Sequence, residues 1–196
     1  MCESKIEKML TQREILLTTD YNSALDMVDF DIKHTVLDVA TGSGRMLEQL
    51  LLRGYKVISG DIDPKALDRA RERLGGLSDR STLVILNAHE MEFDDGSFRS
   101  VTLANAVHEM KNPRGVLHEI ARVLTKDGKL LVTEFNSTGF ELMELHHQLQ
   151  GLGEHPKGEM STEEIDSCLR SLFHNVEIRE LSISYVWVVS AKRLGV

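Results

Sequence analysis

A glycine-rich turn stands between an apolar run and a helical pattern in the segment 34–47, which reads HTVLDVATGSGRML. Gly42 and Gly44 allow the backbone to come close to a ligand and to adopt torsion angles that other residues rarely adopt. In open α/β sheets a ligand binds beyond the carboxyl ends of the strands, so this turn is the expected contact point. Asp38, just before the turn, is either a cap or an anion that faces the ligand.

Asp61 is the second residue with chemical meaning, and it lies 23 positions after Asp38, near the end of KVISGDI. A carboxylate at the end of a second strand can accept hydrogen bonds from both hydroxyls of a ribose. Dinucleotide-binding turns also have a third glycine three positions after the second, but that position is Leu47 here. A P-loop lysine followed by serine or threonine is also missing. The pattern favours a nucleoside ligand without a pyrophosphate.

The elements that position these residues alternate between strands and helices. Strands are predicted at 35–40, 56–62, 82–88, 100–107 and 128–135, and helices at 44–53, 64–74 and 112–124. Asp63 can cap the second of these helices and Pro64 can open it. Asn87 ends the third strand, where a polar side chain could meet the rim of an adenine. Such alternation predicts a parallel sheet with helices on both faces.

The two ends of the chain have other patterns. Apolar spacing up to about residue 31 predicts one or two amphipathic helices, so 1–33 is interpreted as a helical cap over the core 34–135. Within 136–196, a helix is predicted at 140–152, and Ser161 with Glu164 at capping-box spacing begins another. Strands at 175–181 and 184–193 have a very short connection and must form an antiparallel edge hairpin. The 196 residues are expected to form a single domain.

Five segments occur in order: VLDVATGSG, GDIDPKAL, NAHEMEFDDGSFRSV, ANAVHEM and LHEIARVLTKDGKLLVTEF. Together they resemble the class I S-adenosylmethionine-dependent methyltransferases, and among these the ubiquinone/menaquinone-biosynthesis-type group. The resemblance covers roughly 36–135, about half of the chain. Asn87 stands where the family commonly has Asp, and its amide keeps an acceptor for the adenine amino group. Met91, Arg99 and the pair Lys126-Asp127 also depart from the family pattern, which weakens the subgroup assignment more than the activity.

The resemblance implies an α/β Rossmann-like fold, doubly wound, with a mostly parallel seven-stranded sheet, and S-adenosyl-L-methionine as the cofactor. The cofactor-binding positions would be Asp38, Ala40, Gly42, Ser43, Gly44, Asp61, Ile62, Asn87, Ala88, His89 and Asn105. Asp38 would then face the amino group of the cofactor. Methyl transfer mainly requires that the nucleophile be placed in line with the activated carbon, and a general base only if the nucleophile arrives protonated.

Two residues are candidates for catalysis. His108 follows the fourth strand at the open end of the site, and a near-neutral pKa would suit removal of a proton from a hydroxyl or an amine. The alternative for His108 is a packed or solvated histidine without a direct role. Glu134 ends the fifth strand and is a candidate contact of the substrate.

The acceptor is expected to lie under the two segments that flank the core. The connection between the fifth strand and the STEEI helix has about 25 residues, which is long for an α/β unit and typical of a functional loop. Tyr21, Phe140, Met143 and His147 are the predicted acceptor contacts. No metal site is predicted, because the His-Glu pairs lack a second histidine one helical turn away. His146, His147 and His155 are interpreted as surface or pocket residues.

Composition limits the partners and the compartment. The chain has 31 acidic and 23 basic residues, a net charge of −8, and no dense basic run, which argues against nucleic acid. Cys2 and Cys168 match no disulfide or metal spacing, which favours reduced thiols in a cytoplasmic protein. The first ten residues lack a signal-peptide core, and the most apolar run, 183–191, is too short to span a bilayer. No membrane partner is expected, and the oligomeric state is open.

The sequence therefore predicts a methyltransferase that acts on a small-molecule acceptor. A non-catalytic S-adenosylmethionine-binding protein, such as an activator of a partner subunit, would carry the same binding motifs and stays open. An NAD-dependent oxidoreductase is a further alternative, which Leu47 and the order of the motifs oppose.

Overall fold

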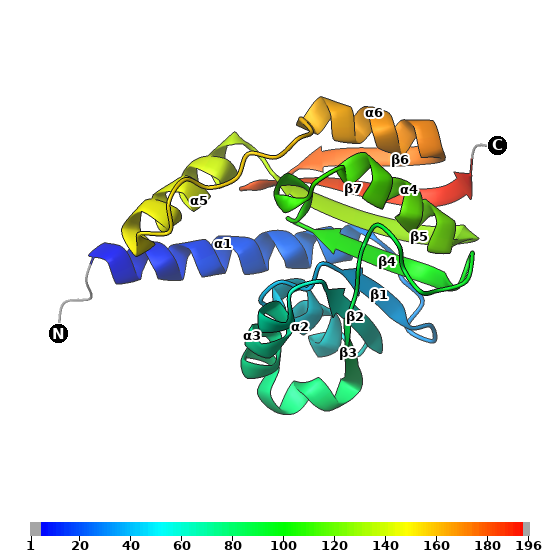
Figure 1. Cartoon of the computed structure of the whole chain (residues 1–196), viewed down its shortest axis with the longest axis horizontal. Helices are drawn as coiled ribbons and strands as arrows, with labels where there is room; N and C mark the ends of the chain where they lie inside the picture. The colour runs from blue at the N-terminus through cyan, green and yellow to red at the C-terminus, as the bar shows by residue number, and fades with distance from the viewer. Residues whose placement is uncertain (1–4, 194–196) are drawn as a thin grey trace.

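The computed structural model describes residues 5–193, which form one seven-stranded sheet with helices on both faces (Figure 1). The strand order is β3-β2-β1-β4-β5-β7-β6. The parallel strands are β1 (Val36–Val39), β2 (Val57–Asp61), β3 (Ser81–Ile85), β4 (Phe98–Ala104) and β5 (Leu124–Phe135). β7 (Ser184–Arg193) runs antiparallel to β5 and to the edge strand β6 (Phe173–Glu180). The predicted doubly wound sheet with an antiparallel edge hairpin is confirmed.

The order of the strands creates a crevice at the carboxyl ends of β1 and β4. From β1 the chain moves outward to β2 and β3, and it then returns to β4 on the other side of β1. Connections that leave two adjacent parallel strands in opposite directions open a space where ligands bind. The glycine turn after β1 lies at this switch point.

Helices pack on both faces of the sheet around two apolar clusters. α4 (Pro113–Val123) and α6 (Thr162–Leu172) bury their apolar residues on one face. α2 (Arg45–Leu52) lies on the other, with α3 (Pro64–Leu74) next to it and a 3-10 helix, η1 (Gly75–Arg80), after it. The predicted caps are present: Asp63 accepts from Lys65 N, and Ser161 and Glu164 form a capping box.

The residues before β1 form a single helix, α1 (Lys5–Met27), which crosses the α2 face of the sheet (Figure 1). Leu17, Tyr21 and Leu25 are buried there. The buried carboxylate of Asp20 accepts from Ser182 N at 3.2 Å and Ile183 N at 2.8 Å, in the β6–β7 turn. These bonds attach the N-terminal helix to the C-terminal hairpin.

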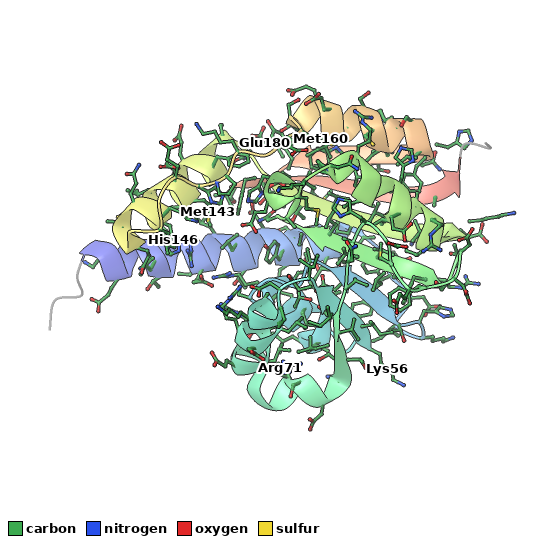
Figure 2. All side chains as sticks on the ribbon, viewed as in Figure 1. Lys56, Arg71, Met143, His146, Met160 and Glu180 are labelled. Atoms are coloured by element: carbon green, nitrogen blue, oxygen red, sulfur yellow. The ribbon has the colours of Figure 1, made fainter. Side chains whose placement is uncertain are left out.

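The segment after β5 forms α5 (Ser137–Gln150), which begins three residues earlier than predicted because Asn136 accepts from Gly139 N as a cap. Figure 2 shows Met143 and His146 on the side of α5 that faces α1. Residues 151–160, here called the strap, lead from α5 to α6 without regular secondary structure.

Two other expectations concern the cysteines and membrane-spanning segments. Cys168 is buried and not in a disulfide, whereas Cys2 lies outside the described residues. Within 5–193, the helices all fall short of the length and apolar character that crossing a membrane requires.

Candidate active site

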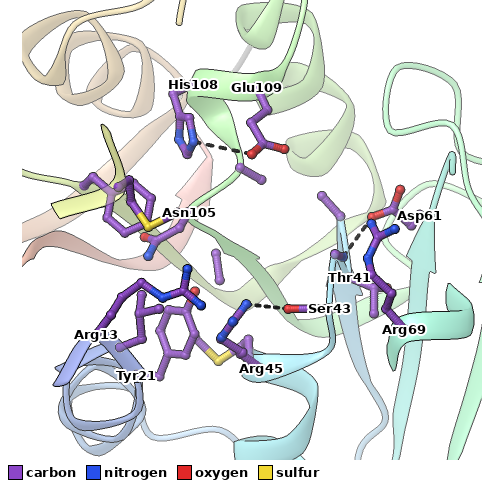
Figure 3. A pocket seen from close by; sticks show the side chains of 18 residues that line it. Arg13, Tyr21, Thr41, Ser43, Arg45, Asp61, Arg69, Asn105, His108 and Glu109 are labelled. Carbon is purple, nitrogen blue, oxygen red and sulfur yellow. Dashed lines mark hydrogen bonds and ion pairs between the residues drawn. The ribbon is translucent and has the colours of Figure 1, made fainter. Parts of the chain in front are cut away.

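A cavity of about 270 Å³ opens at the carboxyl ends of β1 and β4 (Figure 3). Eighteen residues line this main cavity. They come from α1, the glycine turn, the start of α2, α3, the ends of β2, β4 and β5, the loop after β4, and α5. They are Arg13, Leu17, Tyr21, Ala40, Thr41, Gly42, Ser43, Arg45, Met46, Asp61, Arg69, Ala104, Asn105, Ala106, His108, Glu109, Phe135 and Met143. The cavity combines apolar walls with several charged groups.

A second cavity of about 330 Å³ adjoins the first and shares Ala40, Asp61 and Glu109 with it. Its other lining residues are Ile62, Leu86, Asn87, Ala88, His89, Met110 and Lys111. Most of these side chains are apolar, and the space lies between the loop after β2 and the loop after β3. An apolar slot next to a polar cavity is a suitable shape for a flat base joined to a polar chain.

The glycine turn has the unusual backbone that its sequence predicts. Gly42 has φ 55° and Gly44 has φ 77°, both in the left-handed region that favours glycine. A Cβ on Gly44 would lie 2.9 Å from the Cβ of Ala70, so this glycine lets α2 and α3 approach each other. Gly42 lines the main cavity, whereas Gly44 does not. The predicted pair of contact glycines is thus one contact residue and one packing residue.

Asp61 lies where the two cavities meet. Its carboxylate accepts from Gly42 N at 2.8 Å and from Asp63 N at 2.9 Å, so it fixes the glycine turn from the neighbouring strand. A carboxylate offers about four lone-pair positions, so acceptor capacity remains for a ligand. The position is consistent with the predicted contact to a ribose diol.

Asp38 forms its hydrogen bonds within the sheet. Its buried carboxylate accepts from Ser59 Oγ at 2.6 Å and Thr102 Oγ1 at 2.7 Å and is not part of either cavity lining. Burial raises the pKa of Asp38 to about 6, although both hydroxyls act in the opposite direction. The side chain points into the sheet and ties β1 to β2 and β4, and a contact of Asp38 with the cofactor's amino group stays a prediction.

The remaining predicted cofactor residues border one cavity or the other. Ala40, Ser43 and Asn105 line the main cavity, and Ile62, Asn87, Ala88 and His89 line the second. Asn87 follows β3 by two residues, and its Oδ1 accepts from His89 N at 3.1 Å. The side chain therefore shapes its own loop as well as the wall of the cavity.

His108 and Glu134 form a buried ion pair on the far side of the main cavity. His108 Nδ1 lies 2.7 Å from Glu134 Oε1, and the two side chains are 2% and 4% exposed. Burial lowers the pKa of His108, but the carboxylates of Glu109 and Glu134 outweigh it and raise the pKa to about 9. Glu109 is farther away, at 3.7 Å, and its side chain is 63% exposed, so Glu134 is the stronger partner. His108 is therefore an imidazolium at neutral pH, which differs from the near-neutral base expected from sequence.

The strap crosses directly over His108. Gly158 has φ 83°, and a Cβ there would lie 2.6 Å from the Cα of His108. The strap is fixed on both sides of this contact, because His155 N donates to Glu144 and Asn112 N donates to Glu159. The buried His155 ring packs 4.9 Å from the ring of His108.

The predicted acceptor contacts divide into two groups. Tyr21 and Met143 line the main cavity. Phe140 and His147 do not: the Phe140 ring packs 5.4 Å from that of His108, and His147 Nε2 lies 3.2 Å from His155 Nδ1. Glu134 is likewise behind His108 and not in the cavity wall. For 5–193, no three His, Cys, Asp or Glu side chains are grouped so that they could hold a metal ion.

Sequence reasoning missed the basic residues of the main cavity, Arg13, Arg45 and Arg69. Glu14 on α1 accepts from Arg45 Nε at 2.9 Å and from a second Arg45 nitrogen at 2.5 Å. This bidentate pair joins α1 to the start of α2. No sequence motif identifies Arg13 and Glu14 as site residues, because the partner of Glu14, Arg45, is 31 residues away in the sequence.

A doubly wound sheet with a glycine turn and an acidic residue after β2 defines a nucleoside-binding α/β domain. A family model described as a methyltransferase domain matches residues 37–132. A demethylmenaquinone methyltransferase of Clavibacter sepedonicus is 32% identical over 114 residues, 58% of this chain and 46% of that protein. The ubiquinone/menaquinone biosynthesis C-methyltransferase UbiE of Pseudoalteromonas translucida is 34% identical over 115 residues, 56% of this chain and 46% of that protein.

Solved structures share the fold of this chain. The PH0226 protein of Pyrococcus horikoshii superimposes with a TM-score of 0.73 at 18% identity and covers 92% of both chains. The chain belongs to the class I S-adenosylmethionine-dependent methyltransferases, as the five sequence segments predicted. It spans about half the length of the curated relatives that it matches.

Proposed function

We propose that this protein transfers a methyl group from S-adenosylmethionine to a small-molecule acceptor. The observation that carries the proposal is the pair of adjoining cavities that meet at Asp61. The apolar second cavity suits the adenine, Asp61 the ribose, and the main cavity the amino-acid end of the cofactor and the acceptor. When bound, the cofactor supplies an electrophilic methyl group on a sulfonium.

The residues of the chain fit this cofactor by their chemistry. Asp61 keeps acceptor capacity beyond its two backbone bonds, as a ribose diol requires. Gly42 and Ser43 present the turn to the main cavity, and Ala88 with Ile62 contributes apolar surface to the second. Leu47, where a dinucleotide-binding turn would have glycine, is fully buried in the core behind the turn.

His108 would orient the acceptor. Its Nδ1 is held by Glu134, whereas Nε2 makes no hydrogen bond with a described residue and has only the longer ion pair with the exposed Glu109 at 3.7 Å. Because the ring is protonated at neutral pH, it can donate a charge-assisted hydrogen bond to an oxygen of the acceptor but cannot accept a proton. The ring centroids of Phe135 and Phe140 lie 5.3 Å and 5.4 Å from that of His108, so the imidazole has apolar surroundings, and Phe135 also lines the main cavity.

The acceptor is proposed to be small because α1, through Leu17 and Tyr21, and α5, through Met143, line the same cavity as the glycine turn, and this cavity has a volume of only about 270 Å³. One relative is named for a demethylated menaquinone, so a reduced naphthoquinone is a reasonable first compound to try. The curated relatives are about twice as long as their matching part, so this acceptor is one candidate only.

Incubation of the chain with methyl-labelled S-adenosylmethionine and a small-molecule metabolite extract tests the proposal. The expected result is label in an extract component only when the intact protein is present, and its mass then identifies the acceptor. An Asp61→Asn protein serves as the matched control with a weakened site. Cofactor binding without transfer to any component would contradict catalysis and support the activator alternative.

A further inference from the structure

Two buried N–H groups on the α1 side of the main cavity lack a hydrogen-bond partner among the residues that the structure describes. They are Arg13 Nε and Asn105 Nδ2. Both residues line the main cavity, and Figure 3 shows the Arg13 guanidinium extending into it between Tyr21 and Asn105. A buried donor without a partner is unfavourable, because it has lost its hydrogen bonds to water without replacing them. Two of them in one cavity indicate that a ligand supplies the acceptor.

The side-chain oxygen of Asn105 is already hydrogen-bonded, so only its N–H₂ group is left for a ligand. Asn105 Oδ1 accepts from Thr133 Oγ1 at 2.8 Å, and Asn105 N donates to Thr133 O at 2.8 Å. Both bonds tie the residue to β5. The backbone of Asn105 has φ 47°, a left-handed conformation that asparagine tolerates better than most residues. The amide is thus fixed with its acceptor used and its N–H₂ group free.

The charges near Arg13 leave an excess of one positive charge. The carboxylate of Glu14 accepts from Arg13 at 2.6 Å, from Arg45, and from Arg73 at 3.5 Å. Arg73 also pairs with Glu48, so two carboxylates serve three guanidinium groups. Burial acts to raise the pKa of Glu14, but hydrogen bonds from Arg45 and Arg13 outweigh it and hold the pKa at about 2. The Arg13 side chain is only 10% exposed. Charges that are buried to this extent are normally paired.

We infer that Arg13 and Asn105 bind a carboxylate, and that it is the carboxylate of the amino-acid end of S-adenosylmethionine. This inference rests on the proposed function. A carboxylate brings one negative charge and two acceptor oxygens, which match one excess cation and two free donors. With the nucleoside at Asp61, the amino-acid end extends along the glycine turn toward α1. An acceptor molecule with its own carboxylate is the other source of the same chemistry.

Calorimetry with two ligands distinguishes the sources. S-adenosylhomocysteine has the amino-acid end, whereas 5′-methylthioadenosine has the same nucleoside and thioether without it. Arg13→Met keeps an apolar stem and removes the guanidinium. We expect Arg13→Met to weaken the binding of S-adenosylhomocysteine by about 10- to 100-fold, which is the range for loss of a hydrogen bond to a charged group. The affinity for 5′-methylthioadenosine should change by less than about twofold.

Two further variants guard against a folding artefact. Asn105→Asp places a carboxylate where the free amide was. It should therefore also weaken the binding of S-adenosylhomocysteine but not that of 5′-methylthioadenosine. Arg69→Met removes another guanidinium of the main cavity, which pairs with Asp63 at 3.7 Å beside the proposed nucleoside end. This variant should change the affinities for both ligands by the same factor. Thermal unfolding without ligand checks that each variant is folded.

The outcomes separate the inference from the function on which it rests. Equal effects of Arg13→Met and Asn105→Asp on the binding of the two ligands would overturn the carboxylate site. No effect of the variants on the binding of either ligand would overturn its assignment to the cofactor and favour the acceptor's carboxylate as the source. A wild-type chain that binds neither ligand would overturn the proposed function as well.

Discussion

Glu134 holds His108 through two atoms at once, accepting from the backbone N at 2.9 Å and lying 2.7 Å from Nδ1. The same carboxylate accepts from Phe135 N at 2.7 Å. The ring is therefore fixed in orientation as well as in charge, and Nε2 is the only ring nitrogen left for an acceptor molecule.

The first prediction concerns the charge of His108. An NMR titration of the histidine ring nitrogens should show His108 losing its proton near pH 9. Because the folded pKa lies above the unfolded value of 6.5, the pair contributes stability that is fully present below pH 6.5 and is lost as the pH rises through 9. Glu134→Gln should lower the pKa of His108 more than Glu109→Gln, since Glu134 is closer and buried. A His108 pKa that is unchanged in Glu134→Gln would contradict the pairing.

The second prediction concerns Asp61. Asp61→Asn retains one acceptor oxygen but loses the charge, so we expect S-adenosylhomocysteine to bind about 10- to 100-fold more weakly in calorimetry. Asp68→Asn, an exposed residue of α3 paired with Arg71, is the control and should bind like the wild type. Equal affinity of Asp61→Asn and the wild type would remove Asp61 from the site.

The third prediction concerns the contact between the strap and His108. Gly158→Ala should destabilise the protein and shift the His108 ring signals, because the new Cβ would lie 2.6 Å from the His108 Cα. Gly153→Ala is the matched control: Gly153 has nearly the same φ, 82°, with no described atom within 4 Å of its Cβ position. Both variants bear the strain of a left-handed alanine, so only their difference reports the contact. Identical urea midpoints and ring signals would show that the strap does not rest on His108.

The fourth prediction concerns the attachment of α1. Glu14→Gln should lower the free energy of unfolding by about 1–2 kcal/mol at pH 7, a value reduced for the partial exposure of Glu14. The folded pKa of about 2 lies below the unfolded value of 4.5, so this contribution is present above pH 4.5 and is lost as the pH falls through 2. The difference between wild type and variant in urea unfolding should therefore shrink from pH 5 to pH 2. A constant difference would indicate that the charge of Glu14 is not involved.

Local patterns predicted the sheet, most helix boundaries and the residues of the glycine turn, because each depends on neighbours in the sequence. The position of Asp38 could not be read in this way. Its register partners are Ser59 on β2 and Thr102 on β4, and only the paired sheet shows that both hydroxyls face the carboxylate. A sequence motif alone could not show that Asp38 makes these two bonds within the sheet.

Arg13 and the strap illustrate the other limit of sequence reasoning. Arg13 lies in the cavity because Glu14 and Arg45 hold α1 against the start of α2, and nothing near Arg13 in the sequence indicates this packing. Similarly, burial lowers the pKa of His108, and the pKa is nevertheless raised because Glu134, 26 residues later, and Glu109 outweigh the effect of burial. Tertiary contacts determined the charges of the site, whereas local sequence determined its backbone.

Calorimetric titration of the wild-type chain with S-adenosylhomocysteine and, separately, with NAD tests the central claim most directly. We expect saturable binding of S-adenosylhomocysteine with one site per chain and no heat of binding with NAD, since Leu47 fills the position of the third glycine of a dinucleotide-binding turn. The account would be contradicted if the chain bound NAD and not S-adenosylhomocysteine, or if a folded chain bound neither ligand.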